Sequence, residues 1–325
     1  QWHYQFIHHD IWDWDLPNAP IIADLPNGRK IVMSVTKQAW IYAFDRLTGE
    51  PIWPIVERPV PKGDVPGEWY SPTQPFPTRP AAFDRQGFSE DDLIDYTPAL
   101  RAMALEAVQD FRLSRTIFTP PSLQDHPDGT RGLLSLPSST GGANWEHSAF
   151  DPETGIVYVP SRTQLQVLAL AKNPDSDIEL SQGFGVRAPR VQGLEIVKPP
   201  YGRVTAIDMN SGEHLWWIAN ADTPERIKNH PLLEGIDVPR TGIPTRSGVL
   251  LTKTLLFVGE GTGGAGASPI FRAVDKTTGE ILFELDLPDN QTGLPFTYEH
   301  DGEQYLAMFV GGSGNPAQLV AYALP

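Results

Sequence analysis

One short phrase recurs along this sequence, and it limits the folds that the chain can adopt. An apolar run leads to an aspartate, two further residues, Thr or Ser, glycine and glutamate, and a second apolar run follows. The aspartate can accept hydrogen bonds from backbone N–H groups further along the turn, and the glycine suits the positive φ that closes a hairpin. Complete copies span 41–53, 204–216 and 271–283, with a partial copy at 149–158. The phrase therefore predicts repeated antiparallel hairpins.

Each complete copy places a large aromatic side chain four residues after its glycine, at Trp53, Trp216 and Phe283. A flat side chain at a repeated position suits docking between neighbouring sheets. Repeats of about 40–45 residues with four strands each are typical of a β-propeller. We therefore expect an all-β fold, a β-propeller with about four blades. The 29 glycines and 32 prolines agree with many short strands joined by turns.

The copies are unevenly spaced, which predicts that insertions at about 54–140 and 171–200 interrupt a propeller spanning residues 1–325. The first insertion holds one predicted helix, with Thr97 as its N-cap and Pro98 at its first position. Its apolar face is predicted to consist of Leu100, Met103, Ala104, Ala107, Val108 and Phe111.

Composition excludes several classes of protein. The net charge of −15 argues against a nucleic-acid partner, because phosphate binding needs a basic surface. The absence of cysteine excludes disulfides, thiolate zinc sites, C-x-x-C-H haem attachment and cysteine nucleophiles. No apolar run is long enough to predict a transmembrane helix, and no signal peptide is recognisable. The sequence starts at Gln1 in what we expect to be a strand, which favours a fragment or a processed chain.

A glycine-rich segment at 261–266 matches the G-x-G-x-x-G pattern of dinucleotide-binding folds. That fold requires a helix directly afterwards. Residues 268–274 instead have the pattern of a strand, so we expect a turn within a blade.

Several segments resemble one known family. The repeat phrase resembles the tryptophan-docking motif of quinoproteins that use pyrroloquinoline quinone (PQQ). Residues 2–17, which contain Trp12-Asp13, resemble the catalytic segment of the membrane-type quinoprotein glucose and quinate dehydrogenases. Further segments that fit this family are Thr73–Pro77, Phe118–Ser122, Gly141–Trp145 and Val320–Pro325. The resemblance implies an eight-bladed propeller, of which this chain would be the C-terminal half. A missing N-terminal half would hold most metal ligands and much of the cofactor's stacking platform.

Oxidation of an alcohol by an ortho-quinone needs a base, a hydride acceptor and a cation that polarises the quinone carbonyl. The resemblance implies that Asp13 is the base and that Lys37 lies against the quinone oxygens. Asn144 matches a position that hydrogen-bonds the cofactor in this family, and Trp145 would pack nearby. The alternatives are that Asp13 caps a strand end, that Lys37 is an exposed strand lysine, and that Asn144 and Trp145 are a turn amide and a core tryptophan.

Asp15 follows Asp13 by two residues, so in a strand both carboxylates would lie on one face. Two carboxylates directed at one point can share a Ca²⁺ ion, which makes Asp13 and Asp15 candidate metal ligands. Some lanthanide-using relatives carry an acidic residue at this offset, but the glucose branch does too, so Ca²⁺, Mg²⁺ and a lanthanide all remain open. The alternative is that Asp15 is a solvated acid before a turn.

The resemblance implies a periplasmic dehydrogenase, dependent on PQQ and Ca²⁺, that oxidises a sugar, polyol or cyclic alcohol and passes electrons to a quinone or a cytochrome. The first alternative is a non-catalytic propeller that serves as a protein-interaction scaffold. The second is that the chain alone is inert, either as a closed four-bladed ring or as a half with open strand edges.

Overall fold

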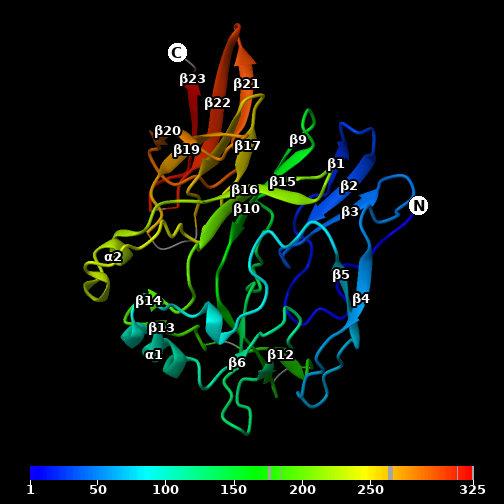
Figure 1. Cartoon of the computed structure of the whole chain (residues 1–325), viewed down its shortest axis with the longest axis vertical. Coiled ribbons are helices and arrows are strands. Elements are labelled where there is room, and N and C mark those ends of the chain that lie inside the picture. Colours follow the sequence, from blue (N-terminus) through cyan, green and yellow to red (C-terminus); the bar gives the residue numbers. More distant parts are fainter. Residues whose placement is uncertain (175–176, 184, 263–265, 313, 324–325) are drawn as a thin grey trace.

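The computed structural model of the chain is built almost entirely of antiparallel β-sheets, as the repeat phrase predicts (Figure 1). It describes residues 1–174, 177–183, 185–262, 266–312 and 314–323.

Within this part of the chain, four sheets correspond to the expected blades. Blade 1 is β1 (Ile21–Asp24), β2 (Lys30–Val35) and β3 (Ile41–Asp45). Blade 2 is β9 (Ala149–Asp151), β10 (Ile156–Arg162), β15 (Gly202–Asp208) and β16 (Glu213–Ala219). Blade 3 is β17 (Val249–Leu251), β18 (Leu255–Gly259), β19 (Ile270–Asp275) and β20 (Ile281–Asp286). Blade 4 is β21 (Phe296–His300), β22 (Glu303–Val310) and β23 (Gln318–Ala323).

The repeat phrase forms the turn between the last two strands of blades 2 and 3, and the turn after β3 in blade 1. The G-x-G-x-x-G segment lies between β18 and β19, so the expected strand follows it. Residues 263–265 of that segment lie outside the described residues.

The two predicted insertions pack against each other at the lower end of the view in Figure 1. The backbone N–H of Ile94 donates to the carbonyl of Ile196, and the N–H of Lys198 donates to Asp92, each at 2.8 Å. The strands of the insertions are β4 (Ile55–Pro59), β5 (Thr73–Pro77), β6 (Arg112–Leu113), β7 (Ser122–Leu123), β8 (Leu133–Ser135), β12 (Leu180–Gln182), β13 (Arg190–Val191) and β14 (Leu194–Glu195). The strand β11 (Gln166–Lys172) leads into the second insertion and pairs with β7, β8 and β12. The first insertion also holds α1 (Pro98–Ala107) and the 3₁₀ helix η1 (Glu90–Asp92). The other helices of the described residues, α2 (Glu225–Lys228) and the 3₁₀ helix η2 (Pro231–Leu233), follow blade 2.

The helix predicted in the first insertion is α1. The Thr97 hydroxyl accepts a hydrogen bond from the N–H of Leu100 at 3.1 Å, which confirms the predicted cap. Leu100 and Ala104 are buried, but Met103 is 40% exposed, so its place on the apolar face was predicted wrongly. The stripe of α1 that faces the protein is narrower than the apolar residues in the sequence suggested.

Two of the three aromatic residues of the repeat dock on the turn glycine of the next blade, whereas Phe283 is exposed and the docking predicted for it is wrong. Trp216 covers Gly279, where an added Cβ would lie 2.9 Å from the indole ring. Its indole N–H donates to the carbonyl of Lys276 at 3.2 Å. Trp53 covers Gly212 in the same way, where the added Cβ would lie 3.1 Å from the ring. Gly212 and Gly279 are therefore each required for two reasons, the positive φ and the ring above them.

Replacing Trp216 by alanine should destabilise the protein by about 2–3 kcal/mol, because a ring packed between two blades is lost. Phe283 is the matched control, since it holds the same repeat position but is 62% exposed. Phe283→Ala should cost less than about 0.5 kcal/mol. Urea unfolding of both variants tests this difference, and equal losses would contradict the docking role.

The turn aspartates are held as carboxylates. Asp275 accepts hydrogen bonds from the backbone N–H groups of Thr277 and Thr278, which lower its pKa below 3.8. A lowered pKa in the folded state gives stability that is present at neutral pH and is lost as the pH falls through the folded pKa. Asp275→Asn should therefore destabilise the protein at pH 7, and the difference from the parent should shrink as the pH falls through the pKa of Asp275 in the folded state. A series of thermal unfolding measurements from neutral to acidic pH tests this, and a pH-independent difference would contradict it.

Candidate active site

Residues 1–20 contain no strand, so the strand expected at the start of the sequence is a wrong prediction. Residues 8–15 are here called the Asp13 loop. The loop is held by contacts with distant segments instead of by a β-ladder. Gln74, on β5, donates to the carbonyl of His8 at 2.7 Å and accepts from its N–H at 2.8 Å. One buried amide thus satisfies both backbone groups that a neighbouring strand would otherwise satisfy.

Two buried tryptophans anchor the Asp13 loop. The rings of Trp12 and Trp14 stack with centroids 5.4 Å apart. Their indole N–H groups donate to the carbonyls of Thr119 and Ser138, at 2.8 and 3.0 Å. Two of the segments that resemble the quinoprotein family, Thr73–Pro77 and Phe118–Ser122, therefore contact this loop through Gln74 and Thr119. Ser138, just before the segment Gly141–Trp145, contacts it as well.

Asp13 lies between the two tryptophans with a left-handed backbone, φ 63°. Its side chain is 65% exposed, so the carboxylate is accessible to a ligand. The neighbouring carboxylate of Asp10 accepts hydrogen bonds from the N–H groups of Trp12 and Trp14. Loss of solvent around the carboxyl raises the pKa of Asp10, and these two hydrogen bonds oppose the rise.

Lys37 follows β2 and lies beneath the Asp13 loop. Its side chain is 7% exposed, so the alternative of an exposed strand lysine is wrong. The ammonium group donates to the backbone carbonyl of Asp13 at 2.8 Å, forms an ion pair with Asp15, and lies 3.7 Å from Oδ1 of Asp13. The carboxylates of Asp13 and Asp15 thus both lie near the Lys37 ammonium. The strand that was expected to place them on one face is absent.

A glycine pair holds Lys37 from the other side. A Cβ added to Gly141 would lie 2.5 Å from Cβ of Lys37, so only glycine fits there. The N–H of Gly142 donates to the Lys37 carbonyl at 2.9 Å. The backbone of Gly141 and Gly142 thus lies close to Lys37, which explains why glycines occupy these positions.

Arg162, which the sequence analysis did not single out, holds residues 140–145, which are called the glycine loop below. Its side chain donates to the carbonyls of Thr140 and Gly141, at 3.0 and 3.3 Å, and its N–H donates to Gly142 at 2.9 Å. It ends the apolar strand β10 and is buried, which lowers the pKa of its guanidinium. A charged residue at the end of an apolar run was the only signal in the sequence, and it does not reveal burial.

Asn144 and Trp145 follow the glycine pair. The Asn144 amide donates to the carbonyl of Thr140 at 2.7 Å and accepts from the Trp145 N–H at 2.8 Å, so it does close a turn. Trp145 is 56% exposed, which excludes the alternative of a core tryptophan. The Arg246 guanidinium lies 5.3 Å from the centre of its ring.

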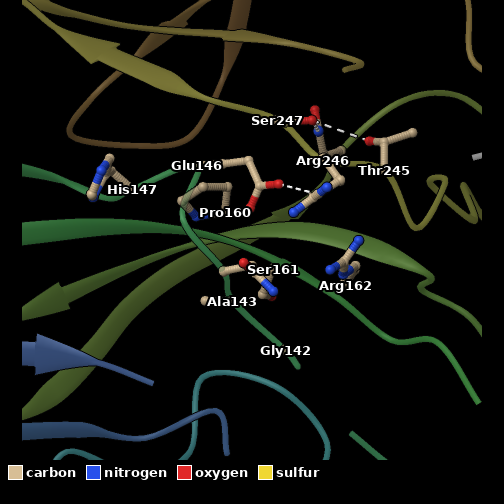
Figure 2. A pocket seen from close by; sticks show the side chains of 12 residues that line it. Gly142, Ala143, Glu146, His147, Pro160, Ser161, Arg162, Thr245, Arg246 and Ser247 are labelled. Atoms are coloured by element: carbon tan, nitrogen blue, oxygen red, sulfur yellow. Dashed lines mark hydrogen bonds and ion pairs between the residues drawn. The ribbon is translucent and has the colours of Figure 1, made fainter. Parts of the chain in front are cut away.

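The surroundings of Trp145 are polar and hollowed. Figure 2 shows Glu146 directed at Arg246, with the Arg162 guanidinium on the other side of the same pocket. Next to it lies a cavity of about 280 Å³. Its lining includes Trp145, His147, Arg246, Thr262, Thr292 and Leu294. An exposed indole and a guanidinium at such a cavity suit a planar anionic ligand.

The described residues contain no cluster of three or more His, Asp or Glu side chains that could enclose a metal ion. Asp13 and Asp15 together offer carboxylate oxygens, and carboxylates are the ligands that Ca²⁺ prefers. Ca²⁺ takes about six to eight oxygens, so these two residues fit one side of such a site. Within the described ranges, no helix is long and apolar enough to cross a membrane.

Comparisons with known proteins identify the family of the chain. The family model for the β-propeller domain of PQQ-type glucose/ethanol/alcohol dehydrogenases matches residues 1–306. The whole chain is 30% identical to 47% of the glycerol dehydrogenase large subunit of Gluconobacter thailandicus. It is 29% identical to 42% of the quinate/shikimate dehydrogenase (quinone) of Acinetobacter baylyi. The quinohemoprotein alcohol dehydrogenase of Comamonas testosteroni shares the fold, with a TM-score of 0.53 and 19% identity over 96% of this chain and 37% of that one.

The chain thus spans less than half the length of these curated relatives. The family match nevertheless covers the repeats, the Asp13 loop and the glycine pair together. The chain belongs to the β-propeller family of PQQ-dependent glucose, ethanol and alcohol dehydrogenases, as its motifs predicted.

Proposed function

We propose that this chain forms one side of the active site of a PQQ-dependent dehydrogenase that oxidises an alcohol group of a sugar, polyol or cyclic alcohol. The observation that carries the proposal is the exposed Asp13 carboxylate held directly beside the buried ammonium of Lys37. A base and a fixed cation close to each other are what alcohol oxidation by a quinone requires.

Asp13 accepts the proton of the substrate hydroxyl, and the hydrogen on the carbinol carbon leaves with its electron pair, so the alcohol becomes a carbonyl. PQQ, when bound, supplies the acceptor of that hydride. Lys37 is already fixed by Asp13 and Asp15, so it stabilises developing negative charge without reorganising.

Asn144 and Trp145 are the proposed cofactor contacts on the glycine loop. The exposed ring of Trp145 offers a face to a planar ligand, and Arg246 behind it fixes the ring. Asp13 and Asp15 are the proposed metal ligands, with Ca²⁺ as the first choice and Mg²⁺ or a lanthanide as alternatives. Because these carboxylates supply only part of a coordination shell, the remaining ligands would come from an N-terminal half of the propeller.

The relatives support the class of substrate and the electron acceptor. One is named a glycerol dehydrogenase subunit and another a quinate/shikimate dehydrogenase (quinone). We infer a small alcohol or sugar as substrate, a quinone or cytochrome as acceptor, and a periplasmic site of action.

The test is a dehydrogenase assay of the protein that carries this chain, loaded with PQQ and Ca²⁺, with an artificial quinone acceptor. Glucose, glycerol and quinate represent the three substrate classes. Turnover of any of them that depends on added PQQ is the expected result. A folded protein that binds neither PQQ nor metal, and oxidises none of them, would favour the scaffold alternative.

A further inference from the structure

Asp10 is the residue of the Asp13 loop to which the proposed chemistry gives no role. Its carboxylate accepts the N–H of Trp12 through Oδ1, at 2.9 Å, and the N–H of Trp14 through Oδ2. These donors belong to the residues immediately before and after Asp13. One side chain therefore fixes the backbone on both sides of the proposed base.

The backbone of Asp13 needs such support. Its φ of 63° is a left-handed conformation, which costs free energy for any residue with a side chain and persists only where the surroundings impose it. The indole rings of Trp12 and Trp14 are buried and hydrogen-bonded, so the ends of this three-residue segment are fixed. Asp10 completes the restraint by fixing the peptide groups themselves.

The carboxylate of Asp13 is itself held loosely. It is 65% exposed and lies 3.7 Å from the Lys37 ammonium, beyond hydrogen-bonding distance. Its direction is therefore set mainly by the backbone at Asp13. A rotation of that backbone would carry the carboxylate away from Lys37 while both side chains stayed intact.

We propose that Asp10 is a positioning residue, which holds the Asp13 carboxylate at the angle from which it reaches the substrate hydroxyl. This inference rests on the proposed function, because it takes Asp13 as the base. It requires both oxygens of Asp10, since each accepts from a different N–H group.

The experiment measures kcat, KM and PQQ retention for Asp10→Asn and Asp10→Ala in the protein that carries this chain, loaded with PQQ and Ca²⁺. Asparagine keeps one acceptor oxygen, and alanine keeps none. We expect kcat to fall about 5-fold to 10-fold for Asn and about 100-fold for Ala, because small misplacement of a reacting group has effects of this size. KM and PQQ retention should stay within about twofold.

Asp45 provides the matched control. Its carboxylate accepts the N–H groups of Leu47 and Thr48 in a repeat turn, at 2.9 Å each. Asp45→Asn should change stability and leave kcat unaltered. If Asp10→Asn and Asp45→Asn lose stability alike and neither loses kcat, Asp10 is merely structural and the inference is overturned.

Asp13→Ala, assayed alongside, separates this inference from the proposed function. An inactive Asp13→Ala together with an Asp10→Ala variant whose kcat stays within about threefold of the parent would overturn the positioning role alone. A fully active Asp13→Ala would overturn the proposed base, and Asp10 would then have no base to position. The graded loss from Asp to Asn to Ala with an inactive Asp13→Ala is the result that supports both.

Discussion

Asp13→Ala is expected to lower kcat by about 10³-fold or more, since a positioned general base contributes effects of this order. PQQ should remain bound, because Lys37, Asn144 and Trp145 are untouched. The loop should also keep its shape, since its anchors are the indoles of Trp12 and Trp14 and not the Asp13 side chain. Steady-state turnover and the absorbance of retained PQQ measure the two effects separately.

Asp24 is the control for this experiment. Like Asp13 it has an exposed carboxylate paired with a basic side chain, at 2.7 Å from Arg46. Asp24→Ala should leave turnover unaltered. Turnover of Asp13→Ala at the parent rate would remove Asp13 from the mechanism, whatever happens at Asp24.

The second large effect is expected at Lys37. Lys37→Ala should weaken PQQ binding by about 10-fold to 100-fold, because a hydrogen bond to a charged group contributes about 1.5–3 kcal/mol. It should also lower kcat, since the cation beside the developing negative charge is lost. The carboxylates of Asp13 and Asp15 would in addition lose the ammonium between them.

Lys276→Ala controls for the removal of a buried ammonium. Lys276 pairs with Asp151 at 2.6 Å and lies in a repeat turn of blade 3, not in the Asp13 loop or the glycine loop. The Lys276→Ala variant should be less stable than the parent and should bind PQQ with the same affinity. Normal PQQ affinity and normal kcat in Lys37→Ala would show that Lys37 does not contact the cofactor.

The repeats could be predicted from sequence because their physics is local. A turn aspartate, a glycine with positive φ and two alternating runs define a hairpin within about a dozen residues. The docking of Trp53 and Trp216 also followed from their repeated position, whereas Phe283 at the same position is exposed, so its docking was predicted wrongly. The N-cap of α1 followed from Thr97 and Pro98 alone.

The Asp13 loop could not be predicted in the same way, because its conformation is set by residues far along the chain. We expected a strand at the start of the sequence, yet Gln74, Thr119 and Ser138 take up the hydrogen-bonding groups of this loop. Arg162 was not predicted for the same reason, since only the folded chain shows that it is buried against the glycine loop. The sequence resemblance nevertheless named the residues that meet there.

Native mass spectrometry of the protein that carries this chain, with cofactor and metal retained, tests the central claim most directly. If Asp13, Lys37 and the glycine loop form one side of a quinoprotein active site, the intact protein should carry one PQQ and one divalent metal ion per active site. Lys37→Ala should lose PQQ under the same conditions. A folded protein that retains neither group from solutions containing both would contradict the account.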